Sequence, residues 1–224
     1  MPLITLNGYA VAVNPAKTVL LMNFENDLVD AATNKAITKI GTTGYSTGGA
    51  SPNGTKCLII TTQTGRNGLQ SAVSDDFNFG VGDFTIECWF ANTQNTTIGQ
   101  LCLIACANAS STTGIVLGYD PSKRNVFVRT PIANIFAPTK QTYGGGAAHA
   151  AYSRVNSVGY LFLNGTLVAS GADARMYTDS ICNIGLSGYG PGNWYGFIDQ
   201  VRITKGKGRY TSNFSPSTSL TTDI

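Results

Sequence analysis

Charged residues are scarce in this sequence. Asp, Glu, Lys and Arg together make up 12% of its 224 residues, and the formal net charge is only +3. Such a weak positive charge does not favour a nucleic-acid partner, because nucleic acids are bound through clusters of Lys and Arg side chains. The densest basic stretch, Lys205, Lys207 and Arg209, is interrupted by glycines and is typical of a solvated loop. The sequence therefore predicts no nucleic-acid binding.

Long apolar runs and paired cysteines are missing as well. No stretch approaches the roughly 18 apolar residues of a transmembrane helix, and residues 1–9 lack the basic and apolar regions of an export signal. Five cysteines occur without the spacing of a zinc site or of a dense disulfide framework. Cys88 lies in an apolar alternation, which predicts a buried core residue. We therefore expect that the protein does not insert into a membrane. We also expect that it is made in a reducing cytoplasm.

Glycine, threonine, serine and asparagine are abundant. The chain has 26 glycines and is 42% hydrophobic, which favours short strands joined by turns. Strand patterns recur every 8 to 12 residues or so, at 18–27, 56–62, 84–90, 100–107, 114–119, 125–130, 149–154, 158–163, 166–170 and 197–203. Asn164-Gly165 predicts a type I′ hairpin turn. These patterns predict an all-β sandwich or jelly roll, preceded at 1–17 by an extra strand, a docking arm or a mobile lead-in.

The strand expected at 197–203 carries an unusual carboxylate. Strict alternation places Asp199 on the same face as Val201 and Ile203, the more apolar of the two faces. A carboxylate on such a face costs several kcal/mol unless a cation, backbone N–H groups or a basic side chain satisfies it. This strand therefore carries either a binding site or a polar interaction within the core.

Five blocks of the sequence match a known family in order. They are Leu20-Leu-Met-Asn-Phe-Glu25, Phe77-Asn-Phe-Gly-Val-Gly-Asp-Phe-Thr-Ile-Glu-Cys-Trp-Phe90, His149-Ala-Ala-Tyr-Ser-Arg154, Tyr160-Leu-Phe-Leu-Asn-Gly-Thr-Leu-Val-Ala-Ser170, and Gly196-Phe-Ile-Asp-Gln-Val-Arg-Ile-Thr-Lys-Gly206 with Arg209-Tyr210 and Asn213-Phe214. Together they resemble the concanavalin-A-like, laminin-G-type jelly roll. The last block looks most like versions carried by virion and tail proteins of tailed bacteriophages.

The resemblance implies a two-sheet antiparallel jelly-roll sandwich that binds glycans or protein surfaces, usually without catalysis. It divides the chain into an N-terminal arm or extra strand at 1–17, the jelly-roll domain at 18–216 and a C-terminal tail at 217–224. In this family the one histidine, His149, begins a strand and is usually packed. Hydrolysis is disfavoured, because retaining glucanases of this fold carry Glu-x-Asp-x-x-Glu on one strand face, whereas this chain has only Glu25 and Glu87 as glutamates.

We therefore expect a non-enzymatic bacteriophage virion surface protein, a capsid decoration or appendage component made in the host cytoplasm. A glycan-binding host-recognition module of a tail or fibre is the alternative. Only about 17 residues lie outside the module, which favours decoration over a tail protein with its own anchoring domain. The expected partners are other virion proteins, further copies of the chain in a homo-oligomer and, in the alternative, a host cell-surface glycan.

Two groups of residues are candidate ligand sites. Sugar-binding sites combine an aromatic platform with polar groups, which singles out Trp194, Tyr195, Tyr189 and Asn193; the same aromatics in a Gly-rich loop also suit a cap or a subunit interface. Calcium prefers six to eight oxygen ligands, which Glu25, Asp27 and Asp199 would begin to supply if the first and last strands of the jelly roll lie side by side. No cofactor other than Ca²⁺ is indicated. In the alternative, Asp199 accepts bonds from backbone N–H groups or pairs with Arg202 or Arg154.

Overall fold

The fold is built almost entirely from short strands, as the sequence predicts. The computed structural model describes residues 3–6, 9–12, 15–25, 27–47, 51, 56–62, 64–93, 99–108, 112–130, 133–138, 146–187 and 192–222. The strands in these ranges are β1 (Leu3–Leu6), β2 (Tyr9–Ala12), β3 (Lys17–Met22), β4 (Ile37–Ile40), β5 (Gly44–Thr47), β6 (Lys56–Ile60), β7 (Gly68–Ser71), β8 (Phe84–Asn92), β9 (Leu101–Cys106), β10 (Ile115–Asp120), β11 (Asn125–Arg129), β12 (Asn134–Phe136), β13 (Ala148–Val155), β14 (Val158–Leu163), β15 (Thr166–Ala172), β16 (Asn183–Ile184) and β17 (Gly196–Lys205). One 3₁₀ turn, η1 (Asp75–Phe77), precedes β8. None of the helical structure in the described ranges is long and apolar enough to cross a membrane.

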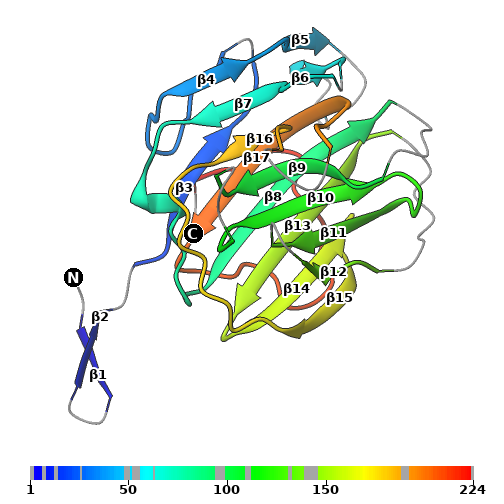
Figure 1. Cartoon of the computed structure of the whole chain (residues 1–224). Coiled ribbons are helices and arrows are strands. Elements are labelled where there is room, and N and C mark those ends of the chain that lie inside the picture. The colour runs from blue at the N-terminus through cyan, green and yellow to red at the C-terminus, as the bar shows by residue number, and fades with distance from the viewer. Residues whose placement is uncertain are drawn as a thin grey trace.

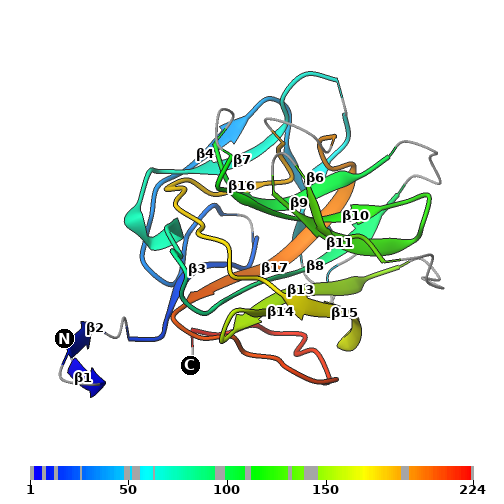
Figure 2. The ribbon, with the colours of Figure 1, turned by 60° about the horizontal axis from the view of Figure 1, so that its bottom comes forward.

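Two antiparallel sheets pack face to face (Figure 1, Figure 2). In the described residues one sheet has seven strands in the order β12-β11-β10-β9-β16-β7-β4. The other has eight, in the order β15-β14-β13-β8-β17-β6-β5, with β3 also paired to β17. The first and last strands of the sandwich are therefore side by side, as expected for a jelly roll. The all-β, two-sheet jelly-roll prediction is confirmed.

The core fills the space between the two sheets. Ile86 of β8 and Ile203 of β17 face it from one sheet, and Leu103 of β9 and Leu117 of β10 face it from the other, all with 0% of their surface exposed. Burying an aliphatic side chain of this size contributes about 1.5–3 kcal/mol. Cys88 also lies in this core, as predicted, and the cysteines are free thiols.

A bulge in β17 breaks the alternation on which the prediction for Asp199 depends. Gln200 takes a left-handed backbone φ of 48° at the bulge. Ile198 before the bulge and Val201 after it both lie in the core, whereas Asp199 pairs with Trp89 on the outer face. The expectation that Asp199 shares the face of Val201 is wrong, because one extra residue shifts every later side chain to the opposite face.

Both hairpin regions are present. Asn164 and Gly165 have φ values of 50° and 73° between β14 and β15, the pair of positive angles that defines the predicted type I′ turn. At the N-terminus, β1 and β2 pair with each other, from Leu3 with Ala12 to Leu6 with Tyr9. Figure 1 shows this hairpin standing apart from the sandwich, so β1 and β2 are extra strands outside both sheets, and the docking-arm interpretation of this segment stays a prediction.

The chain closes by crossing the outer face of the eight-stranded sheet. We call residues 206–222 the C-terminal strap; Figure 2 shows it running beneath that sheet. Trp89 Nε1 donates to Ser217 O at 2.9 Å, and Arg202 Nη1 donates to Thr221 O at 3.1 Å. The segment expected as a C-terminal tail is thus tied to the sandwich through the last residues that the structure describes.

Candidate functional site

The broad faces of the sandwich offer little open surface. On the eight-stranded sheet, Glu87 and His149 are completely buried beneath the strap. On the outer face of the seven-stranded sheet, Cys102, Val116 and Phe127 have 0–1% of their surface exposed. A ligand therefore has better access at the ends of the sandwich, where the loops lie.

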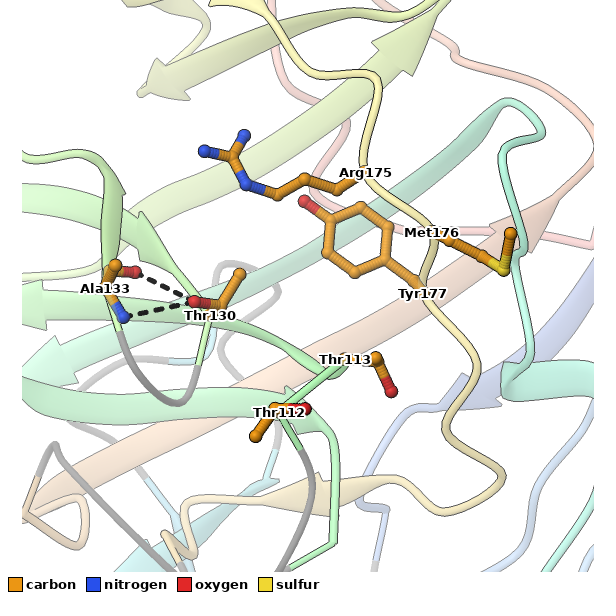
Figure 3. A pocket seen from close by; sticks show the side chains of 7 residues that line it. All are labelled: Thr112, Thr113, Thr130, Ala133, Arg175, Met176 and Tyr177. Carbon is orange, nitrogen blue, oxygen red and sulfur yellow. Dashed lines mark hydrogen bonds between the residues drawn. The ribbon is translucent and has the colours of Figure 1, made fainter.

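A pocket of about 400 Å³ opens at one such end. Its lining comes from three segments: the loop before β10, the turn between β11 and β12, and the segment that follows β15. Figure 3 shows the seven residues of this pocket, which we call the end pocket: Thr112, Thr113, Thr130, Ala133, Arg175, Met176 and Tyr177. Most of its lining surface is apolar, with hydroxyl groups and one guanidinium among the apolar atoms.

The wall that carries Arg175 and Tyr177 is held by a buried arginine. Arg154 is fully buried and donates to Gly82 O at 2.9 Å, to Gly80 O at 2.9 Å and to Arg175 O at 2.7 Å. Its guanidinium lies 4.9 Å from the centre of the Tyr177 ring. Because a buried guanidinium is costly unless its donors are satisfied, this set of bonds specifies one arrangement of the wall.

A buried carboxylate supports the same wall from below. Asp173 is fully buried and accepts bonds from Tyr152 OH at 2.6 Å and from Tyr177 OH at 2.9 Å. Burial raises the pKa of both tyrosines, and the neighbouring Asp173 carboxylate adds to the effect. Arg175 Nη1 completes the group at 3.1 Å from Asp173 Oδ1 while 45% of the Arg175 side chain stays exposed.

Hydrogen bonds also order the opposite side of the end pocket. The Thr130 hydroxyl accepts from Ala133 N at 3.1 Å, and Thr130 N donates to Ala133 O at 2.8 Å. The hydroxyls of Thr113 and Thr178 lie 2.8 Å apart, which joins the β9–β10 loop to the Tyr177 segment. The end pocket is therefore bounded by side chains whose positions are specified on both sides.

The aromatic residues predicted as a sugar platform lie elsewhere. Trp194 is completely buried, its Nε1 donates to Phe197 O at 3.2 Å, and its ring packs edge-on against Phe90 at 5.6 Å. With no exposed face, this ring cannot stack on a sugar, so the structure corrects the platform interpretation for Trp194. Asn193 is buried too and accepts from Ser187 N, while Tyr195 is half-buried. Tyr189 lies outside the described residues.

The predicted calcium ligands come together only in part. Burial is the main cause of the raised pKa of Asp199, and the charge of Glu25 adds to it, so these two carboxylates lie near each other. Asp27 is exposed and accepts from Val29 N at 3.3 Å. No group of three or more His, Cys, Asp and Glu side chains forms a metal site within the described ranges. The calcium site stays a prediction.

Asp199 nevertheless has unusual chemistry. Its Oδ1 accepts from Gln200 N at 2.8 Å, whereas its Oδ2 is buried without a hydrogen-bond partner among the described residues. The same is true of Asn23 Oδ1, which follows Met22 of β3, the partner of Val201 in β17. Burial raises the pKa of Asp199 from 3.8 to about 7, although hydrogen bonds from Ser51 and Gln200 N oppose the shift. Two orphaned oxygens suit either a proton on Asp199 or a bound cation. In the part of the chain that the structure describes, neither arginine pairs with Asp199: Arg154 donates to Gly82 O and Arg202 donates to Glu87.

Glu87 has a structural environment. Its carboxylate accepts from Arg202 Nε at 2.8 Å and from Tyr210 OH at 3.0 Å, and it lies 3.1 Å from His149 Nε2. Burial alone would raise the pKa of Glu87, but the hydrogen bond and charge of His149, together with Arg202, lower it. His149 is packed, as predicted. The Glu87 carboxylate is thus fully engaged in hydrogen bonds that hold the strap against the sheet.

Sequence patterns did not single out the end pocket. Its threonines lie in turn segments, where hydroxyl residues are common for conformational reasons, and Arg175 follows β15 without a motif around it. Two of the segments adjoin β10 and β11 of the seven-stranded sheet and the third follows β15 of the eight-stranded sheet, so they meet only because the two sheets pack against each other. The one available signal is Arg154 in the His149–Arg154 block, a charged residue in an apolar strand.

Comparisons with known proteins agree with this fold. A model of the family described as the concanavalin A-like lectin/glucanases superfamily matches residues 64–207, from just before β7 to the end of β17. A comparison with curated protein sequences finds no match.

Several solved structures share the sandwich. Domain 4 of AbnA, an extracellular arabinanase from Geobacillus stearothermophilus in complex with arabinotriose, is 20% identical with a TM-score of 0.56, over 86% of this chain and 94% of that chain. A carbohydrate esterase of the Shiga toxin-encoding bacteriophage phi24B is 10% identical with a TM-score of 0.57, over 86% and 100%. The binding domain of botulinum neurotoxin serotype D is 12% identical with a TM-score of 0.53, over 86% of this chain but only 49% of that chain. At such identities the likeness establishes a shared fold alone.

Proposed function

Because the chain belongs to the concanavalin A-like lectin/glucanases superfamily, we propose that it is a non-enzymatic carbohydrate-binding module on the surface of a bacteriophage virion. The end pocket is the observation that carries the binding part of this proposal. It is open to solvent, its volume of about 400 Å³ suits one or two sugar residues, and it combines apolar surface with hydroxyl groups. The host cell-surface glycan of the sequence-based alternative is the ligand we propose.

Two of the structural neighbours support carbohydrate as the ligand class. The arabinanase domain was solved with arabinotriose, and the phage phi24B protein is described as a carbohydrate esterase. The second neighbour comes from a bacteriophage, which fits a phage origin, and the virion part of the proposal is supported by the resemblance of residues 196–214 to virion and tail proteins. Other virion proteins and further copies of the chain are the partners that such a location implies.

We propose that the protein is not a glycosidase, because its carboxylates lack the surroundings that a catalytic pair requires. A retaining glycosidase needs two carboxyl groups on either side of the scissile bond. Glu87 is buried in its network with Arg202, and Glu25 lies exposed near Asp199. Asp173, beneath the end pocket, is fully buried and bonded to two tyrosines and an arginine. None of these three groups is placed to attack or protonate a sugar in that pocket.

A blocking substitution tests the carbohydrate proposal. Ala133 is exposed on the rim, and its backbone makes the bonds to Thr130, so Ala133→Trp fills the opening and leaves those bonds in place. We expect saturation-transfer NMR with a panel of neutral and acidic oligosaccharides to detect binding by the wild type and at least a tenfold or so weaker binding by the variant. Asn134→Trp, on the exposed neighbour, is the control. Absence of binding to the whole panel, or equal binding by Ala133→Trp, contradicts the proposal.

A second candidate function is capsid decoration, in which the only partners are other virion proteins. The hairpin β1–β2 favours it: within the described residues the hairpin pairs with neither sheet, and an isolated two-stranded hairpin is only marginally stable in water. Its two open edges are available to a partner strand. We expect deletion of residues 1–15 to leave the melting temperature unchanged and to lower the occupancy of the protein on particles. Unchanged occupancy would count against decoration through the hairpin.

A further inference from the structure

Among the residues that the structure describes, the end pocket has a single charged side chain in its lining. Of the seven described residues that form it, Arg175 alone is charged, and almost half of that side chain is exposed. The remaining polar groups are threonine hydroxyls and the buried Tyr177 hydroxyl. A ligand that enters this pocket therefore meets one cation on a largely apolar surface.

The nearby carboxylates do not face the ligand. Asp173 has 0% and Asp179 has 4% of its surface exposed. Asp173 accepts hydrogen bonds from Tyr152, Tyr177 and Arg175. Asp179 accepts a hydrogen bond from Asn108 N at 3.0 Å. Both acids are buried, so neither of them presents an exposed negative charge to an anionic ligand.

The guanidinium of Arg175 is also held in position. The bond to Asp173 Oδ1 uses one Nη1 donor out of the five that a guanidinium offers. Figure 3 shows the group beside the Tyr177 hydroxyl, on the side of the pocket that faces Thr130 and Ala133, whereas Met176 points the other way. An arginine that is anchored at one nitrogen can direct its remaining donors at a carboxylate with little further loss of side-chain entropy.

On this basis we propose that the end pocket selects saccharides that carry a carboxylate on the pyranose ring, and that Arg175 is the residue that recognises this group. The apolar lining accepts the C–H face of the ring, and the threonine hydroxyls bond to its hydroxyl groups. Uronic acids and sialic acids share the recognised chemistry. The inference rests on the proposed carbohydrate-binding function and specifies its ligand class.

The test compares acidic saccharides with neutral counterparts. Digalacturonic acid and its dimethyl ester have the same rings, and sialyllactose and lactose provide a second acidic and neutral pair. Calorimetric titration of the full chain should show tighter binding of an acidic ligand than of its neutral counterpart by about tenfold, the usual order for a bond to a charged group. Raising NaCl from about 50 to about 500 mM should reduce that preference, because the site is partly exposed to screening.

Variants then assign the preference to one residue. Arg175→Gln should bring the acidic and neutral affinities within about twofold of each other, while Arg66→Gln, the same change at an exposed arginine before β7, should leave the preference intact. Arg175→Lys retains the charge and should keep part of the preference, which covers the case in which Arg175→Gln does not fold.

The results for the acidic and neutral ligands test the acidic-sugar inference separately from carbohydrate binding in general. Equal binding of acid and ester by the wild type, or a preference that survives Arg175→Gln, overturns the acidic-sugar inference and leaves carbohydrate binding in place. A preference for either acidic ligand that disappears in Arg175→Gln supports the inference. Failure of all four ligands to bind overturns the acidic-sugar inference, whereas the proposed function is overturned only if the whole oligosaccharide panel also fails to bind.

Discussion

Replacement of Asp199 by Asn tests the reading of this buried carboxylate. The pKa of Asp199 is raised from 3.8 to about 7 by burial, so the folded state holds the proton more tightly than the unfolded chain does. The contribution of Asp199 to the free energy of unfolding is therefore fully present below pH 3.8 and is lost as the pH rises through about 7. Asp199→Asn keeps an oxygen for the bond from Gln200 N and removes the ionisation.

The magnitude follows from the two pKa values. The difference between 3.8 and about 7 corresponds to about 4 kcal/mol at about 1.36 kcal/mol per pKa unit. We expect about 2 to 4 kcal/mol in practice, because water and small cations reduce the penalty of a buried charge. In EDTA, Asp199→Asn should thus be more stable than the wild type at pH 8 and about equal to it at pH 4.

Urea unfolding between pH 4 and pH 8, in EDTA and in millimolar Ca²⁺, is the assay. Parallel stability curves of wild type and Asp199→Asn in EDTA would refute the argument about burial. Calcium separates the two ways of satisfying the carboxylate: a cation site requires that Ca²⁺ raise the wild-type stability at pH 8 and leave Asp199→Asn unaffected. If Ca²⁺ does not change the stability of either protein, the calcium prediction for Glu25, Asp27 and Asp199 is contradicted. A proton on Asp199 would then be the way in which the buried carboxylate is satisfied.

Two further predictions concern buried groups. Glu87→Gln should cost about 3–5 kcal/mol in urea unfolding at pH 7, because Arg202 loses its buried partner; since the pKa of Glu87 is lowered, the wild-type advantage should fade as the pH falls below 4.5. A loss that persists unchanged at pH 3 would show that the charge is not its cause. Trp194→Ala should cost about 3–5 kcal/mol, because a fully buried ring is removed; a loss below about 1 kcal/mol would instead support an exposed platform.

Most of the architecture could be predicted because it depends on local patterns. Alternation over 84–90 and 158–163 reports a strand with one buried face, and Asn164-Gly165 reports the turn that only residues tolerant of positive φ can form. The sequence patterns do not predict the short strands β4, β5, β7, β12 and β16, since two to four residues are too few to show a period. The five-block resemblance added the two-sheet arrangement, which no single strand contains.

The candidate site could not be predicted in the same way. Trp194 in a Gly-rich loop has the composition of a sugar platform, but its exposure depends on Phe90 of another strand, which packs against it. The face of the sheet on which Asp199 lies depends on the bulge at Gln200, and the alternation of the sequence does not reveal this bulge. The end pocket requires three segments from two different sheets, which only the packing of the sheets brings together.

The sequence by itself determined which segments are strands and where the chain turns, because backbone sterics and the burial of alternate side chains act over a few residues. Tertiary structure alone decided which polar groups are buried, which are paired and which face solvent. The physical reason is that the pKa of Asp199, the pairing of Glu87 and the exposure of Arg175 depend on neighbours from distant strands, and a charge is stabilised or penalised by everything packed around it.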